Sequence, residues 1–210
     1  MTDARPQAAF SENIQRRPTT YSSVATLADE PVGLTCSVAV GRVWGSDRAD
    51  CLAGYPSFEL AAQTVKSGQH DVLLVPSAYP DIRSFFFDPQ LEAVESFLQP
   101  LPDMVLAVPE AVDPEHLDLV FHHPATTALV ERISDRVTRA VLATSNSAAC
   151  RMVLEHHGAV DPTDKVKVGA VTNQLCSDHY GLRTVEVLAA GTAMCFVVFR
   201  RKDSGGRQYG

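Results

Sequence analysis

The sequence predicts an α/β fold, and three observations lead to it. Short apolar runs of the kind that form covered strands alternate with capped or amphipathic helical segments along most of the chain. With 210 residues, the chain is long enough for one domain or for two small lobes. The Pro-rich stretch LQPLPD, residues 98–103, is the best candidate for a crossing between two lobes.

The predicted elements follow from apolar periodicity and from residues that start or stop helices. We expect strands at residues 22–28, 49–55, 70–76, 103–110, 117–124, 139–145, 165–172, 184–189 and 193–201. We expect helices at residues 34–45, 57–68, 88–100, 125–136, 147–158 and 173–182. Ser57 is typical of a helix N-cap, Pro89 of a first helical turn and Gly158 of a helix end. Residues 1–19 are expected to form a flexible arm and residues 202–210 a disordered tail.

Charge, apolar content and cysteine usage exclude several classes of function. With 18 Lys and Arg against 25 Asp and Glu, the net charge of −7 argues against nucleic acid as a partner. No apolar run approaches the roughly 18 residues that a membrane span needs, so we expect no membrane partner. The first 23 residues lack the apolar core of a secretory signal, which indicates a cytoplasmic protein.

The cysteines indicate free thiols. They are odd in number and lack CxxC spacing, which argues against a disulfide framework and against a zinc site. They are Cys36, Cys51, Cys150, Cys176 and Cys195. The pairs of adjacent histidines do not form a metal site either, because the side chains of neighbouring helical positions point apart. We therefore expect no metal site.

Polar side chains gather where predicted strands give way to helices. Four such junctions carry hydroxyls or amides and lie at residues 31–37, 121–127, 142–147 and 170–174. A fifth polar strand end lies at residues 75–80. Such residues are typical helix caps, which is one interpretation. In open α/β sheets, ligands also bind at the carboxyl ends of strands beside helix N-termini, so the same residues could form the walls of a carboxylate site.

Several of these motifs together resemble the catalytic domain of the prephenate dehydratase family. The motifs are the N-terminal Pro-x-Gly, VP before a polar loop, HHPATTAL, SNSAACRMV and YGL. The stretch LLVPSAYPDIRSFFFDPQLEAVESF is similar to the decarboxylase branch known from the bacilysin pathway, and the resemblance covers about residues 24–200. It implies two α/β lobes with a cleft between them, like type II periplasmic binding proteins. The first lobe would be residues 20–100 plus 183–201 and the second residues 101–182.

One departure from the dehydratases favours the decarboxylase branch. Dehydratases carry a Thr-Arg-Phe motif in the last strand, and here the matching positions are Met194, Cys195 and Phe196. The acid that expels the ring hydroxyl is therefore missing. The resemblance then implies a non-aromatising prephenate decarboxylase without cofactor, which gives a dihydro-4-hydroxyphenylpyruvate for a specialised-metabolite pathway. Two alternatives stay open: a non-catalytic module that binds a small carboxylate, and a residual prephenate dehydratase. A homodimer is compatible with the sequence, which does not decide it.

The resemblance also assigns candidate site residues. Arg83, Tyr79 and His123 are the candidate catalytic residues. Arg83 would be the cation that binds a substrate carboxylate, and Tyr79 would orient the ring hydroxyl or relay a proton. His123 matches the histidine of the family's His-Pro motif. The candidate substrate-binding residues are Ser77, Ser145, Asn146, Thr172, Asn173, Phe85 and Met194.

Each assignment has a structural alternative. Arg83 could face solvent, Tyr79 could be a rim aromatic, and Phe85, a candidate wall for the substrate ring, could pack in the core. His123 could be a structural histidine ahead of a Pro-led helix. Cys36 lies at a helix N-terminus that favours a thiolate, but no general base is identified beside it, so nucleophilic catalysis is not the preferred interpretation.

Overall fold

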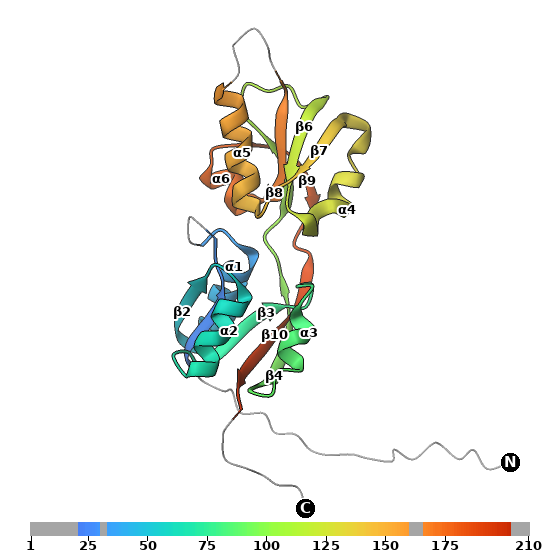
Figure 1. The fold of residues 1–210 in the computed structure, drawn as a ribbon. Coiled ribbons are helices and arrows are strands. Elements are labelled where there is room, and N and C mark those ends of the chain that lie inside the picture. The colour runs from blue at the N-terminus through green and yellow to red at the C-terminus, as the bar shows by residue number, and fades with distance from the viewer. Residues whose placement is uncertain (1–20, 30–32, 160–165, 203–210) are drawn as a thin grey trace, which may run out of the picture.

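The computed structural model describes residues 21–29, 33–159 and 166–202, which form two lobes, each built on one sheet (Figure 1). The two-lobed α/β fold is therefore confirmed. The arm expected at residues 1–19 and nearly all of the tail expected at 202–210 lie outside the described residues.

The first lobe has a five-stranded sheet in the order β2-β1-β3-β10-β4. Its strands are β1 (Tyr21–Leu27), β2 (Ala49–Tyr55), β3 (Val72–Pro76), β4 (Leu91–Pro100) and β10 (Ala193–Arg201). β1 runs parallel to β2 and β3, whereas β10 runs antiparallel to β3 and β4. Its helices are α1 (Cys36–Gly45), α2 (Phe58–Ser67) and α3 (Ile82–Phe86).

The second lobe has a five-stranded sheet in the order β7-β6-β8-β5-β9. Its strands are β5 (Met104–Val108), β6 (Leu117–His122), β7 (Val137–Leu142), β8 (Val168–Asn173) and β9 (Arg183–Ala189). β6 runs parallel to β7 and β8, and β5 runs antiparallel to β8 and β9. The helical segments are η1 (Pro124–Thr126), α4 (Thr127–Glu131), η2 (Ser134–Arg136), α5 (Asn146–Ala159) and α6 (Gln174–His179).

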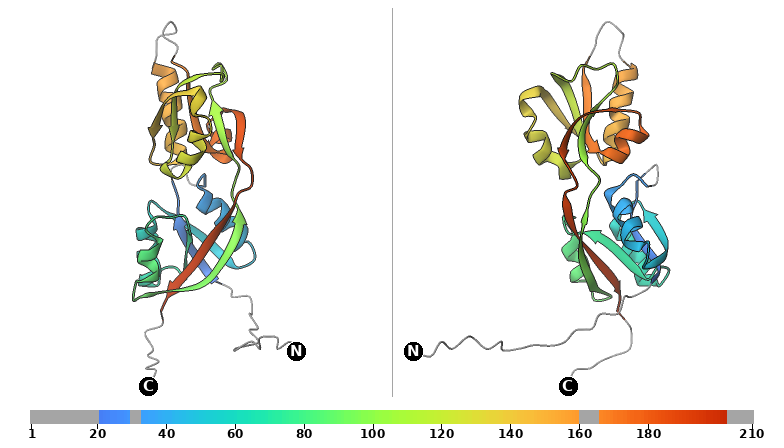
Figure 2. Two further views of the ribbon diagram at one scale, coloured as in Figure 1. Left: turned by 90° about the vertical axis from the view of Figure 1, so that its right-hand side faces the viewer. Right: turned by 180° about the vertical axis from the view of Figure 1, so that it is seen from behind.

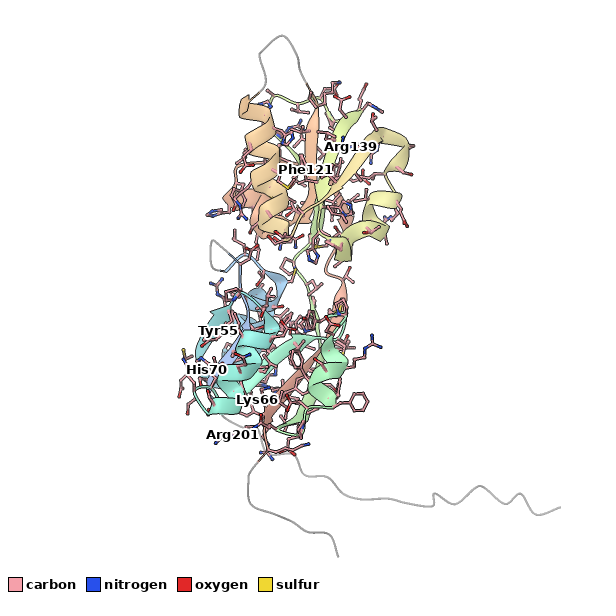
Figure 3. The ribbon with its side chains drawn as sticks, viewed as in Figure 1. Tyr55, Lys66, His70, Phe121, Arg139 and Arg201 are labelled. Atoms are coloured by element: carbon pink, nitrogen blue, oxygen red, sulfur yellow. The ribbon has the colours of Figure 1, made fainter. Side chains whose placement is uncertain are left out.

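Both sheets are covered on both faces, which explains why their central strands are apolar at consecutive positions. In the first lobe, Leu73 and Val75 pack under α2, whereas Val72 and Leu74 pack under α1. In the second lobe, α5 and α6 cover one face and α4 the other. Phe121, labelled in Figure 3, is buried on the α5 face, where its ring centroid lies 5.0 Å from that of His156.

Two chain segments connect the lobes, and Figure 2 shows them side by side. The first, residues 101–103, joins β4 to β5 within the Pro-rich stretch expected to cross. The second, residues 190–192, joins β9 to β10. The return to the first lobe therefore differs from the expected boundary at residue 183, because β9 pairs with β5 of the second lobe.

Three local predictions were wrong. The helix expected at residues 88–100 is the strand β4, which pairs with β10 over its whole length, so tertiary pairing overrides the helical preference of its Leu, Glu and Ala residues. The helix expected at 125–136 is broken into η1, α4 and η2, and the short helix α3 was not expected at all.

α2 forms as predicted: Ser57 accepts a hydrogen bond from the Leu60 N–H, and Gly68 ends the helix with φ of 81°.

Candidate functional site

The carboxyl ends of parallel strands from both lobes face each other (Figure 1). A cavity of about 320 Å³ lies there. It is lined by Leu27, Ala28, Asp29, Gly54, Tyr55 and Pro56 of the first lobe and by Thr144 and Ser145 of the second. This volume is at the lower end of the range for small-molecule sites, and the position matches the strand ends at which α/β proteins bind ligands.

Tyr55 lines this cavity, and a hydrogen bond to His70 fixes its side chain. Its hydroxyl oxygen lies 2.8 Å from Nε2 of His70, and Figure 3 shows both side chains together on the first lobe. The Tyr55 hydroxyl is thus engaged by His70, a residue that the lining of the cavity does not include.

The start of α5 supplies the second lobe's part of the cavity. Ser145 Oγ accepts a hydrogen bond of 2.9 Å from the Ala148 N–H, so Ser145 caps the helix as one of the two interpretations proposed. Asn146 differs, because its Oδ1 is buried and has no hydrogen-bond partner among the described residues. An amide can be turned so that Nδ2 takes this place, so Asn146 is suited to accept from or donate to a ligand.

Thr172 and Asn173, at the end of β8, lie next to this start but are already engaged. Thr172 Oγ1 donates to the Asn146 carbonyl oxygen at 3.2 Å. Asn173 Oδ1 accepts from the Cys176 N–H at 2.8 Å, and its Nδ2 donates to the Leu34 carbonyl oxygen of the first lobe, also at 2.8 Å. Both residues are fully buried. They hold α5, α6 and the first lobe in place around the cleft.

His123 lies at the end of β6 and begins η1. Its Nδ1 accepts a hydrogen bond of 3.2 Å from the Ala125 N–H, so the neutral ring carries its proton on Nε2. Burial, and then the neighbouring His122, lower the pKa of His123, while Asp29 acts in the opposite direction. The structural cap predicted as the alternative is therefore present, and Nε2–H is left as the donor of a neutral imidazole.

Asp29, Arg151 and Tyr180 interact with one another and were not assigned to the site by the sequence analysis; of the three, the cavity lining includes Asp29. Asp29 lines the cavity, and its Oδ2 is buried without a hydrogen-bond partner among the described residues. Arg151 of α5 donates to the Tyr180 hydroxyl at 3.2 Å, which raises the pKa of Arg151, and Asp29 acts on Arg151 in the same direction. Arg151 and Tyr180 stand inside the motifs SNSAACRMV and YGL, which carried the resemblance, so a signal for them existed.

Ser77 and Met194 are brought together at the end of β3 and the start of β10, and the lining of the cavity includes neither of them. Ser77 Oγ lies 3.9 Å from Met194 Sδ, and the Ser77 N–H donates to the Cys195 carbonyl oxygen at 2.8 Å. The end of β3 and the start of β10 therefore present a hydroxyl and a thioether. A hydroxyl and a thioether are neutral groups, and neither is a strong acid.

Arg83, Tyr79 and Phe85 form a separate group around α3, and the lining of the cavity includes none of them. Phe85 is only 4% exposed and lies in the core with Phe199, which is the alternative expected for it. Tyr79 stacks on Phe85 and donates its hydroxyl to Glu59; burial and then Glu59 raise the pKa of Tyr79 far above its usual value. Arg83 is exposed.

The thiol of Cys36 behaves differently from the expectation for a helix N-terminus. Burial raises its pKa to about 11, although Asn173 acts against this. The electrostatic preference of the helix end for a thiolate is thus outweighed by desolvation.

Within the described residues, no group of three or more His, Cys, Asp and Glu side chains is arranged to hold a metal ion. None of the described helices has the length and apolar content needed to cross a membrane.

The two sheets, the two chain segments that cross between them and the cavity between the lobes define a two-lobed α/β protein. No protein-family model and no curated protein matches the sequence. A prephenate dehydratase from Arthrobacter aurescens, solved with L-Phe, is similar in structure, with a TM-score of 0.64 and 15% identity over 89% of this chain. This chain spans 62% of that protein's length.

Two further structures show how widely the fold is used. GqqA, described as a quorum-quenching acylase, has a TM-score of 0.62 and 16% identity over 90% of this chain and 67% of its own. The periplasmic VFT2 domain of BvgS from Bordetella pertussis has a TM-score of 0.52 and 18% identity over 86% of this chain and 80% of its own. The chain therefore shares the fold of prephenate dehydratases and of periplasmic binding domains.

Proposed function

We propose that this protein is a non-aromatising prephenate decarboxylase. The observation that carries the proposal is the contact between Met194 and Ser77, at the edge of the first-lobe sheet where its parallel strands end. In the family that the sequence resembles, the matching strand carries the Thr-Arg-Phe motif of the dehydratases. Here a thioether stands beside a hydroxyl, so the ring hydroxyl of prephenate would have no strong acid beside it to help it leave.

The reaction needs little covalent chemistry from the protein. The bond between the ring and its carboxylate breaks, the electrons of that bond pass into the ring diene, and a ring carbon takes up a proton. The diene accepts the electrons, so we propose that no metal or organic cofactor takes part. The protein must orient prephenate, hold its pyruvyl carboxylate and place the departing carboxylate in a less hydrated environment.

We assign these tasks to the cleft residues. Arg151 and Asn146 of α5 would hold the pyruvyl carboxylate, because a guanidinium donates to a carboxylate and the Asn146 amide can be turned so that Nδ2 takes the place of the unpartnered Oδ1 and donates as well. Tyr55 would contact the ring. His123 is our candidate for a group that donates a hydrogen bond to prephenate from its neutral Nε2–H, because its ring lies within electrostatic reach of Asp29, which lines the cavity, and the proton that the ring carbon takes up would come from solvent.

The test is direct. Purified protein is incubated with prephenate while CO₂ release and the ultraviolet spectrum are recorded. Release of CO₂ with a conjugated, non-aromatic product supports the proposal. Phenylpyruvate would instead identify a dehydratase. Saturable binding without turnover would identify a carboxylate-binding module.

A further inference from the structure

Two buried oxygens at the cavity between the lobes have no hydrogen-bond partner among the described residues. One is Oδ2 of Asp29, which lines the cavity from the first lobe. The other is Oδ1 of Asn146, the first residue of α5, which follows the cavity-lining Ser145 of the second lobe. Figure 1 shows this end of α5 directed toward the first lobe. Buried polar atoms are normally paired in folded proteins, so these oxygens point to a donor that the cavity takes up.

The chemistry of these two oxygens indicates that the missing donor is a cation. A carboxylate accepts hydrogen bonds and donates none, and the amide oxygen of Asn146 also only accepts. The charge of Asp29 reaches the second lobe, because it acts to raise the pKa of Arg151 and of His123. A primary ammonium group is compact, positively charged and carries three N–H donors, so it can bond to both oxygens at the same time.

The rest of the cavity defines the remainder of such a ligand. In the second lobe, Ser145 caps the start of α5, and this end of the helix carries a partial positive charge that favours an anion. Arg151 stands in the same helix, so a carboxylate fits on this side. The other first-lobe residues of the lining offer a largely apolar surface; they are Leu27, Ala28, Gly54, Tyr55 and Pro56. An apolar body therefore fits on that side.

We propose that this cavity binds an α-amino acid with an apolar side chain. The ammonium group bonds to Asp29 Oδ2 and Asn146 Oδ1, and the carboxylate lies at the start of α5. The side chain packs against the apolar lining of the first lobe. Prephenate has no ammonium group and leaves Asp29 unpaired, so the amino acid competes with prephenate for the same cavity. This inference goes beyond the proposed function and does not rest on it, because the amino acid is bound and not transformed.

The experiment is isothermal titration calorimetry of the full-length protein at neutral pH. The ligands are L-leucine and L-phenylalanine, together with 4-methylpentanoate and 3-phenylpropanoate, the same molecules without the amino group. We expect saturable binding of at least one amino acid and at least tenfold weaker binding of its analogue without the amino group. Asp29→Asn should remove this preference, because the charge that pairs with the ammonium group is lost. Asp47→Asn removes an exposed carboxylate of the first lobe, and this matched control should keep the preference.

The contrary outcomes are equally defined. Equal affinity for an amino acid and its analogue, or no binding of either amino acid, overturns the proposal and leaves water as the partner of Asp29. The wild-type comparison needs no variant, so poor folding of Asp29→Asn does not decide it. An undiminished preference in folded Asp29→Asn would overturn the role of this carboxylate. Amino-acid binding by a protein that neither binds nor converts prephenate would reject the proposed function and leave this inference standing, and conversion of prephenate without amino-acid binding would do the reverse.

Discussion

Arg151 and Arg83 are two cations whose surroundings differ, and the comparison tests which one holds a substrate carboxylate. Arg151 contacts Tyr180 and lies within electrostatic reach of Asp29, whereas Arg83 is exposed on α3. We expect Arg151→Gln to lower kcat/KM for prephenate by about 10²-fold or more, because a charge-assisted hydrogen bond to a desolvated carboxylate is lost. Arg83→Gln should stay within about twofold. A larger loss for Arg83→Gln would place the carboxylate at α3, as the sequence predicted.

His123 should make the stability of the protein depend on pH. Its pKa in the folded state is lowered, so the unfolded state binds more protons, and the free energy of unfolding falls as the pH drops from about 6.5 through the lower folded pKa. Above about pH 6.5, the protonation of His123 no longer lowers the free energy of unfolding. His123→Asn keeps a helix-capping side chain without a titrating ring. We therefore expect a smaller loss of melting temperature between pH 7.5 and 5.5 in the variant than in the wild type; equal losses would contradict the assignment.

At the scale of elements, the start of α5 combines a helix cap with a residue that we propose to bind the ligand. Ser145 caps the helix, whereas Asn146 has an amide oxygen without a partner. Ser145→Ala should lower the free energy of unfolding by about 0.5–2 kcal/mol, because the cap is lost. Asn146→Ala should change stability little and reduce the rise of melting temperature that prephenate causes. Thermal melts with and without prephenate separate the two effects, and a full ligand-induced shift in Asn146→Ala would make this residue structural.

The same elements show what sequence patterns can and cannot predict. Ser57, Gly68 and the apolar runs act locally, so α2 and the central strands were predictable from their own residues. The strand β4 was not, because its conformation depends on pairing with β10, about 100 residues later. The polar junctions around Ser145 and Asn173 were predicted as a group. The separate roles of these residues were not predicted. Asn173, for example, bonds to Leu34 in the other lobe, a contact that no local sequence pattern encodes.

At the scale of the whole molecule, Asn173 connects helix capping with the approach of the two lobes. Its Oδ1 caps α6, and its Nδ2 bonds to Leu34 of the first lobe. Asn173→Asp keeps an acceptor for the cap but loses the donor and places a negative charge against the Leu34 carbonyl. We therefore expect the lobes to separate while α6 stays folded, with a larger radius of gyration in small-angle X-ray scattering and at least tenfold weaker binding of prephenate.

Gln174→Glu is the matched control for that variant, because it makes the same change of charge at the next residue. Its side chain bonds to Asp178 and Thr184, both within the second lobe. The control should keep the wild-type radius of gyration, because the bond between the lobes is untouched. If Asn173→Asp also kept the wild-type radius, other contacts would hold the lobes together. The cleft would then be set by the two crossing segments at residues 101–103 and 190–192, whose short lengths already limit how far the sheets can separate.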